Sequence, residues 1–297
     1  MELRVLRYFL AVAREENITA AAKILNITQP TLSKQMMELE NELGKKLFVR
    51  GNRKISLTED GMFLLRRAQE IVDLTDKTEA EFHNSQEPVH GEVFIGCGET
   101  RAMRYVADAF RKLRGDYPGI RLYLYSGNGE DVSKRLEKGL LDFGLFVGLT
   151  DFKKYDYLKL PVTDTWGLLM RKDDPMASKG IITPDMLPQI PLLYSRQAMI
   201  QNELSGWMGR DVHSLNLVAT YNLVYNASIM VEAGLGAALC IDGLINTTGD
   251  SPLRFCPFEP RLTADLVLAW KKSQVFSRAA EKFLEYFTAE EAKLSRT

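Results

Sequence analysis

The chain of 297 residues is 45% hydrophobic and 26% charged, which is typical of a globular protein of two or three domains and excludes a disordered one. Its formal charge of -1 excludes a uniformly basic nucleic-acid binder, so any basic surface must be local. The first residues lack the uncharged core of a signal peptide, and no apolar run approaches the ~18 residues of a membrane helix. The cysteines and histidines show neither a disulfide framework nor metal-ligand spacing. We therefore expect a cytoplasmic protein with no cofactor, no metal and no membrane partner.

Two short helices are predicted at the N-terminus. The first runs to about Glu15 and carries an apolar stripe at helical spacing. The stripe consists of Leu3, Leu6, Phe9, Leu10, Val12 and Ala13. Asn17 or Thr19 then caps a second helix, TAAAKIL, whose alanines let another helix cross closely. Asn26 ends this helix because asparagine tolerates the left-handed conformation.

A third helix starts sharply within the stretch NITQPTLSKQMMELENELG. Thr28 is its predicted cap, and Pro30 then falls in the first turn, where a backbone N–H has no partner within the helix. Gly44 is the expected glycine at the helix end. The spacing predicts a buried face made of Leu32, Met36, Leu39 and Leu43.

Two short helices, a tight turn and a sharply started helix predict a helix-turn-helix, in which the front of the last helix enters the major groove of DNA. That front presents side chains that bond bases or phosphates: Thr28, Gln29, Thr31, Ser33 and Lys34. The following KKLFVRGNRKISLT predicts a β-ribbon, or wing, with basic residues at its tip, Lys54 among them. Residues 23–57 carry seven Lys or Arg and three Glu, a local basic surface of the kind that DNA binding needs.

The run AAKILNITQPTLSKQMMELENELGKKLFVR, followed by LTEDG, resembles the winged helix-turn-helix of the LysR-type transcriptional regulators. The resemblance covers about 45 residues almost without a gap. It implies base or backbone contacts from Gln29, Pro30, Thr31, Ser33 and Lys34, and phosphate contacts from the wing, notably Arg50 and Arg53. Alternatively, the polar side chains at the helix front form only a solvated face and the helices a plain core.

A long helix is predicted from a Thr58 cap to about residue 86, before Pro88 and Gly91. Its heptad seam consists of Leu64, Ala68, Ile71, Thr75, Thr78 and Phe82. At 1.5 Å per residue this helix spans about 42 Å, too long for a small domain to cover. In the family it resembles, this helix packs against its twin in a dimer. A solvated spacer helix is the alternative.

From Glu92 onward, strand-like runs alternate with helix-like ones, which predicts α/β architecture with largely parallel sheets. The predicted strands are EVFIG, RLYLYS, DFGLFVG, WGLLMR, IPLLY, LNLVAT, GAALCI and ADLVLAW. Helices are predicted at 101–114, 130–138, 199–208, 222–233 and 277–292. The resemblance implies a two-lobed effector domain similar to periplasmic solute-binding proteins, with crossings near 161–165 and 265–269 and a ligand cleft between the lobes.

In such a fold the cleft lies at the carboxyl ends of strands, where helix N-termini point N–H groups inward. The candidate effector-binding residues are Gly98, Thr100, Arg101, Ser126, Gly127, Asn128, Val147, Tyr194, Ser195, Arg196, Tyr221, Asn222 and Gly236. Hydroxyls and amides at helix starts favour a carboxylate or another anion, and the two arginines strengthen that preference if they turn inward. Alternatively, these Ser and Thr residues are only helix caps.

The sequence therefore predicts an α/β protein with an all-α, winged N-terminal module. It predicts three parts: a DNA-binding domain (1–58), a dimerisation helix (59–90) and an effector domain (91–297). The effector domain divides into lobe I (91–161 and 268–297) and lobe II (162–267). We expect a regulator that binds double-stranded operator DNA and a small-molecule effector and assembles as a homodimer or homotetramer. An enzyme with a fused DNA-binding module is the alternative; incomplete Gly-x-Gly fingerprints and the absence of a P-loop or nucleophile elbow disfavour it.

Overall fold

The computed structural model describes residues 1–50, 55–83, 89–148, 153–195, 203–272 and 274–294, with the backbone alone for residues 50, 77, 80–83 and 292–294. The chain divides into two compact units, Met1–His83 and Asn84–Thr297. Among the described residues, none of the helices combines the length and the apolar character that crossing a membrane requires.

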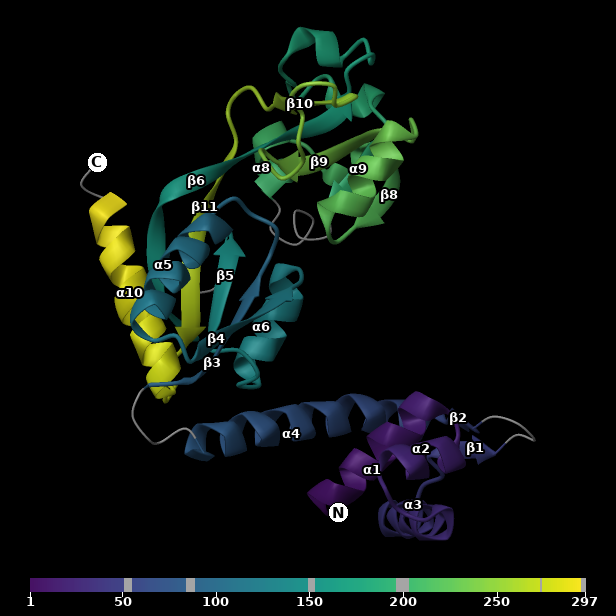
Figure 1. Ribbon diagram of the computed structural model, residues 1–297. Coiled ribbons are helices and arrows are strands. Elements are labelled where there is room, and N and C mark those ends of the chain that lie inside the picture. Colours follow the sequence, from purple (N-terminus) through teal and green to yellow (C-terminus); the bar gives the residue numbers. More distant parts are fainter. Residues whose placement is uncertain (51–54, 84–88, 149–152, 196–202, 273, 295–297) are drawn as a thin grey trace. The chain divides into compact units, whose positions relative to one another are not determined.

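Three helices build the core of the N-terminal unit (Figure 1): α1 (Leu3–Glu15), α2 (Ile18–Ile24) and α3 (Gln29–Leu43). The side chain of Asn17 accepts a hydrogen bond from the Ala20 amide at 3.0 Å, so Asn17 rather than Thr19 caps α2. Asn26 has φ 55°, the left-handed conformation that the sequence predicts at this turn. Phe9, Ala21 and Leu32 are fully buried where the three helices meet.

Helix α3 starts and ends as predicted. Thr28 is its N-cap and accepts a hydrogen bond from the Thr31 amide, while Pro30 occupies the first turn. Gly44 ends the helix with φ 63°. The predicted buried face is correct for Leu32, Met36 and Leu39 but wrong for Leu43. Leu43 is 38% exposed because it lies in the last turn, within the exposed stretch 41–46.

A two-stranded antiparallel wing follows, formed by β1 (Phe48–Arg50) and β2 (Ile55–Leu57). Thr58 then caps the long helix α4 (Glu59–His83), since its hydroxyl accepts a hydrogen bond from the Gly61 amide at 3.0 Å. The same hydroxyl donates to the Lys46 carbonyl at 2.6 Å, which ties the start of α4 to the base of the wing.

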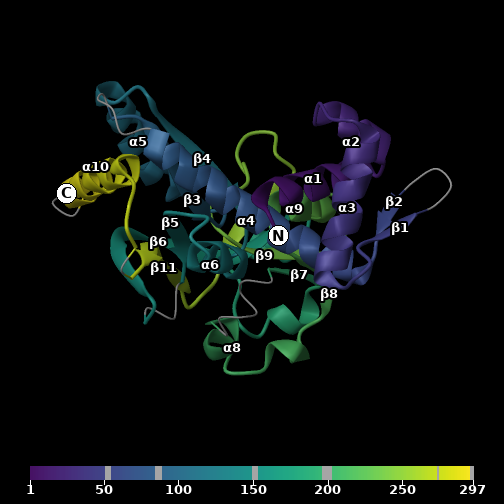
Figure 2. The ribbon, with the colours of Figure 1, turned by 90° about the horizontal axis from the view of Figure 1, so that it is seen from below.

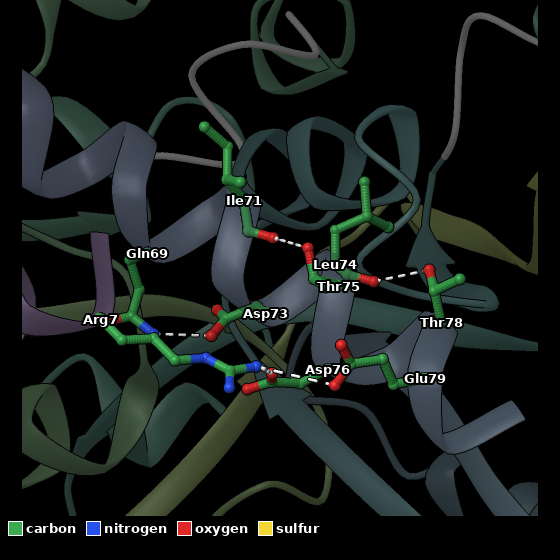
Figure 3. Close-up of polar contacts among 9 residues, drawn as sticks. All are labelled: Arg7, Gln69, Ile71, Asp73, Leu74, Thr75, Asp76, Thr78 and Glu79. Carbon is green, nitrogen blue, oxygen red and sulfur yellow. Dashed lines mark hydrogen bonds and ion pairs between the residues drawn. The ribbon is translucent and has the colours of Figure 1, made fainter. Parts of the chain in front are cut away.

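Helix α4 buries one face within its own unit. Leu64, Ala68 and Val72 are buried and pack on α1. Leu64 and Ala68 are therefore unavailable for the predicted dimer seam, because the three-helix core already covers them. Ile71 and Thr78 remain exposed, Thr75 is half-buried, and the side chain of Phe82 lies outside the described residues. Arg7 of α1 forms ion pairs with Asp76 and Glu79 of α4 (Figure 3).

Lobe I of the C-terminal unit is a sheet with helices on its faces (Figure 1). Its elements are β3 (Gly91–Cys97), α5 (Met103–Asp116), β4 (Ile120–Ser126), α6 (Gly129–Glu137), β5 (Phe143–Val147) and α10 (Arg278–Leu294). Strand β3 lies between β4 and β5 and is parallel to both. The buried carboxylate of Asp142 accepts a hydrogen bond from the Phe94 amide at 2.8 Å, so it ties the start of β5 to β3.

Lobe II contains a second sheet. Its elements are β7 (Leu192–Ser195), α8 (Glu203–Met208), β8 (Leu217–Tyr221), α9 (Val224–Glu232), β9 (Ala237–Ile241) and β10 (Leu253–Pro257), with one-turn 3-10 helices at Ala177–Lys179, Leu187–Gln189 and Val212–Ser214. Strand β7 lies between β8 and β9 and is parallel to both. Strand β10, which the sequence does not predict, pairs with β6 at the edge.

Two strands join the lobes. Strand β6 (Tyr155–Arg171) pairs with β11 (Thr263–Lys271) up to Thr165 and with β9 from Trp166 onward, so it changes sheet without a break. The chain returns just before β11, which pairs with β5 of lobe I from Leu266. The first crossing thus falls at the end of the expected range 161–165, and the second falls several residues before the expected 265–269.

Candidate nucleic-acid interface and ligand cleft

The front of α3 presents a small set of polar side chains to solvent. Thr28, Gln29, Pro30, Thr31 and Lys34 are exposed, and Ser33 is half-buried. Gln29 Nε2 donates to Ser33 Oγ at 3.0 Å, which orients the amide along the helix face. Figure 2 shows α2 and α3 meeting at their short turn, with the wing strands beyond the end of α3. An amide and hydroxyls held at a helix front can bond base edges in a major groove.

Glu40 fixes the wing to α3. Its carboxylate is only 6% exposed and accepts hydrogen bonds from the amides of Leu47 (2.9 Å) and Phe48 (3.3 Å) and from Lys46 Nζ (2.8 Å). Burial by itself would raise the pKa of Glu40, but these three bonds outweigh it and the pKa is lowered. The sequence singles out the exposed positions of α3 and misses this buried carboxylate, which holds the start of β1 in place.

We expect Glu40→Gln to loosen the wing, because its neutral amide oxygen accepts more weakly from the Leu47 and Phe48 amides, while its Nε2 meets the Lys46 ammonium donor to donor and the ion pair is lost. A hydrogen bond to a charged group contributes about 1.5–3 kcal/mol against about 1 kcal/mol for a neutral one, so the Leu47 and Phe48 amides should exchange faster with solvent. Since the folded-state pKa is lowered, this stabilisation is present above the unfolded pKa and lost as pH falls through the folded pKa. Hydrogen exchange of the full chain measures both effects. Glu38→Gln, on the exposed face of the same helix, is the control, and equal exchange in the two variants would contradict the role of Glu40.

A cleft lies between the two lobes, at the carboxyl ends of their strands. Lobe I contributes Gly98, Glu99, Gly127 and Val147, and lobe II contributes Trp166, Ser195, Tyr221, Asn222, Val224, Cys240, Ile241 and Leu244. The cavity between them is about 40 Å³, room for a few waters only. A metabolite therefore requires the lobes or the side chains between them to move.

Glu99 bridges this cleft. Its carboxylate, which follows β3 of lobe I, accepts a hydrogen bond from the Val224 amide at the start of α9 in lobe II. Leu223, the N-cap residue of α9, makes no side-chain hydrogen bond to the start of the helix. Burial raises the pKa of Glu99, and the bond from Val224 opposes that rise. Among the described cleft residues Glu99 is the one carboxylate, and none is an arginine or lysine.

Two family patterns cover most of the chain. Residues 3–62 match the bacterial regulatory helix-turn-helix protein of the lysR family, and residues 86–292 match the LysR substrate binding domain. The chain belongs to the LysR family. It is a DNA-binding transcriptional regulator with an effector-binding domain, and the enzyme alternative is thereby rejected.

Relatives of this LysR-type regulator match nearly its whole length. The Hca operon transcriptional activator HcaR of Escherichia coli (strain K12) is 29% identical over 282 residues, 93% of each chain. The regulator BsdA of Bacillus subtilis (strain 168) is 26% identical over 97% of this chain and 100% of its own. The solved structure of CbnR, another LysR family regulator, has a TM-score of 0.76 at 19% identity, covering 98% of this chain and 99% of that one. That likeness confirms the two-lobed fold.

Only part of the expected effector set lines the cleft of the LysR-type regulator. Gly98, Gly127, Val147, Ser195, Tyr221 and Asn222 do so. Thr100 is buried and donates to Asp164 of β6 at 2.6 Å, and Arg101 lines a different cavity. Asn128 caps α6, Ser126 is exposed outside the lining, and Arg196 lies outside the described residues. Gly236 precedes β9 and so lies at the end of that strand away from the cleft.

Tyr194 lies in the core of lobe II, where its hydroxyl has no hydrogen-bond partner among the residues that the structure describes. Its neighbour Ser195 faces the cleft instead, because successive strand residues point to opposite faces. Of the predicted wing contacts, Arg53, Lys54 and the side chain of Arg50 lie outside the described residues.

Several cleft residues of the LysR-type regulator escape sequence reasoning. Trp166 and Cys240 belong to strands whose apolar pattern predicts core positions. Glu99 is not among the predicted effector-binding residues, although it stands at the same strand end as Gly98 and Thr100, which are. Burial raises the pKa of the Cys97 thiol to about 11 and that of Cys240 to about 12, so both thiols are neutral near pH 7.

Proposed function

We propose that this LysR-type regulator reads a symmetric operator as a dimer and changes its DNA-binding arrangement when a small carboxylate enters the lobe cleft. The proposal assigns residues 1–58 to DNA binding, 59–90 to dimerisation and 91–297 to effector binding, within the cytoplasm. The observation that carries it is the exposed polar front of α3, with Gln29 held by Ser33. CbnR, whose fold is similar, has been solved with its target DNA.

The apolar face that α4 leaves uncovered supports a dimer through this helix. Phe63, Ile71 and Leu74 of α4 are exposed, although Leu64, Ala68 and Val72 of the same helix are buried. Thr75 and Thr78 donate their hydroxyls to the carbonyls of Ile71 and Leu74, each at 2.8 Å (Figure 3). Because those hydroxyls are satisfied within the helix, both threonines can face a partner helix without burying an unpaired donor.

Exposed apolar side chains at both edges of the C-terminal sheet support a tetramer. Tyr123 and Leu124 lie on edge strand β4, and Val218 lies on edge strand β8 at the other end of the sheet. Tyr225 and Ile229 of α9 add to the second surface. Apolar groups concentrated at two separate edges are typical of association surfaces, and we assign them to contacts between effector domains.

The start of α9 supports a carboxylate effector. A carboxylate, that of Glu99, already accepts a hydrogen bond there, which fits the partial positive charge of a helix N-terminus. An effector carboxylate that displaces Glu99 would itself accept the hydrogen bond from the Val224 amide of α9. The direct hydrogen bond between Glu99 of lobe I and α9 of lobe II would then be lost. To regulate, such an effector must bind one arrangement of the lobes better than the other.

Selection of genomic DNA fragments by the full-length protein tests the proposal. We expect a few sites with a dyad motif at about 150 mM salt, where phosphate contacts alone bind weakly. Leu74→Glu should give a monomer by light scattering and lose the dyad sites. Gln69→Glu, the same charge change at an exposed position of α4, should behave like wild type. If the wild-type protein were a monomer, or if the recovered DNA fragments shared no motif, the proposal that a dimer binds a symmetric operator would be refuted. Carboxylates added to the selection should change which sites are recovered.

A further inference from the structure

The C-terminal unit contains a second cavity beside the strands that join the lobes. Its volume is about 550 Å³, within the range of metabolite sites, and it shares no lining residue with the cleft. The first turns of α5, the middle of β6 and the segments after β9 and before β11 form its walls. We call this cavity the hinge groove, because both crossings between the lobes run along it.

Three guanidinium groups line the hinge groove, and most of their donors are free to bind a ligand. Arg261 directs both Nε (3.2 Å) and Nη2 (2.7 Å) at one neutral acceptor, the hydroxyl of Thr165. Arg104 is 86% exposed, and its nearest carboxylate, Asp108, lies at 3.8 Å, beyond hydrogen-bond distance. The guanidinium of Arg101 donates no hydrogen bond within the described residues, although its charge opposes the rise that burial causes in the pKa of Asp164, which also lines the groove. Each guanidinium carries five donors, so the groove offers an unusual excess of them.

The acidic groups of the groove, in contrast, are held by residues outside it. Glu290 is paired with Lys112, Asp108 lies 3.6 Å from Arg111, and Asp164 accepts a hydrogen bond from Thr100. None of these three partners lines the groove. Asp242 is the remaining acid, and its side chain is exposed to solvent. Within the described residues, none of the three arginines donates a hydrogen bond to a carboxylate, although Arg104 stands in a loose ion pair with Asp108 of the groove at 3.8 Å.

Residues of both lobes and of both crossings meet at the hinge groove. The Asp242 amide donates to the Thr165 carbonyl at 2.9 Å, and the Trp166 amide donates to the Leu262 carbonyl at 2.9 Å, so both crossings meet beside it. Arg101 of lobe I packs on the backbone of Gly243 in lobe II, where an added Cβ would lie 2.2 Å from Arg101 Cδ. A ligand held by Arg101 and Arg261 would contact both lobes and both crossings.

We propose that the hinge groove is a second ligand site, which takes a small anion with a carboxylate or phosphate group through Arg101, Arg104 and Arg261. Guanidinium groups match the planar or tetrahedral oxygens of such anions and bind them through paired hydrogen bonds. This site is separate from the proposed effector cleft, and its occupant acts on the junction of the lobes. A protein with both sites responds to two metabolites at once.

Calorimetric titration of the full-length protein with inorganic phosphate and with citrate tests the site. We expect saturable binding of at least one probe and a Kd at least tenfold weaker in Arg261→Gln and in Arg104→Gln. Arg104 is so exposed that its replacement should not disturb the fold. The Arg104→Gln variant therefore still tests the site if Arg261→Gln does not fold. Arg210→Gln, which removes an arginine paired with Asp185 elsewhere in lobe II, should leave the Kd unchanged.

The probe that loses affinity identifies the anion as phosphate or carboxylate. Absence of saturable binding for both probes overturns the proposal, as does equal affinity in wild type and both arginine variants. A probe whose affinity instead changes in Glu99→Ala occupies the cleft, and that result also overturns the groove assignment. The DNA selection does not depend on the groove, so the regulator function and this inference can fail independently.

Discussion

The double substitution Gln29→Ala, Ser33→Ala will remove recognition of the operator while leaving weak binding to any DNA. These side chains bond each other at 3.0 Å in the free protein and together offer an amide and a hydroxyl to base edges. A good base contact contributes about 1–3 kcal/mol, so the pair should cost roughly thirtyfold or more in operator affinity. Fluorescence anisotropy with a selected operator and a scrambled duplex measures both affinities.

Lys34→Ala should behave differently from the double variant. A lysine that contacts phosphate contributes to all DNA equally, so both affinities should fall and the salt dependence should become shallower by about one counterion. Gln69→Ala, on the exposed surface of α4, controls for the loss of a glutamine. If the double variant weakened both duplexes equally, these residues would contact the backbone and the operator would be read elsewhere.

Glu99→Ala will tighten binding of a carboxylate effector. The substitution vacates the Val224 amide and removes a like charge from a half-buried site, where two charges about 4 Å apart repel strongly enough to expect at least a roughly tenfold change. Glu99→Gln should give a smaller gain, because its amide oxygen can still accept the same bond. Glu232→Ala, at the far end of α9, is the matched control. Loss of carboxylate binding in Glu99→Ala would show that Glu99 recognises the effector directly.

The pH dependence of the same titration provides an independent check. Burial raises the pKa of Glu99, so as pH falls through that value the side chain becomes neutral and no longer repels a carboxylate. Affinity in wild type should therefore rise as pH falls, and it should be flat in Glu99→Gln. Cys97, Tyr221 and Cys240, the titratable groups that interact with Glu99, all have raised pKa values and stay neutral over this range.

The N-terminal module was predictable because its signals are local. The hydroxyl of Thr28, the fixed φ of Pro30 and the left-handed Asn26 each act within one turn of chain, and the structure has all three where the sequence puts them. The same holds for most strands and helices of the lobes, but not for β10 or for the part of β6 before Trp166, which the sequence does not predict. Which partner buries an apolar helix face is not decided by local sequence. Leu64 and Ala68 fit a heptad seam equally well whether a partner or α1 covers them, and here α1 does.

The sequence predicts which strand ends form the cleft, but not which of the side chains after those strands line it. That Ser195 and Tyr221 line it follows from parallel strands ending at one edge. Where a side chain turns after the strand depends on distant residues. Thr100 turns to Asp164 on β6, and Arg101 turns to Gly243 after β9, partners that are 64 and 142 residues away in sequence. No pattern within one segment contains that information, so the arginine expected in the cleft lies in the hinge groove.

The three cysteines of the chain, Cys97, Cys240 and Cys256, are all buried and their thiols are not paired with one another. Burial raises the pKa of the Cys240 thiol to about 12, so this thiol is neutral at pH 7 although it lines the cleft. Because oxidants and electrophiles react with thiolates, we expect Cys240 to react slowly with peroxide in the folded protein.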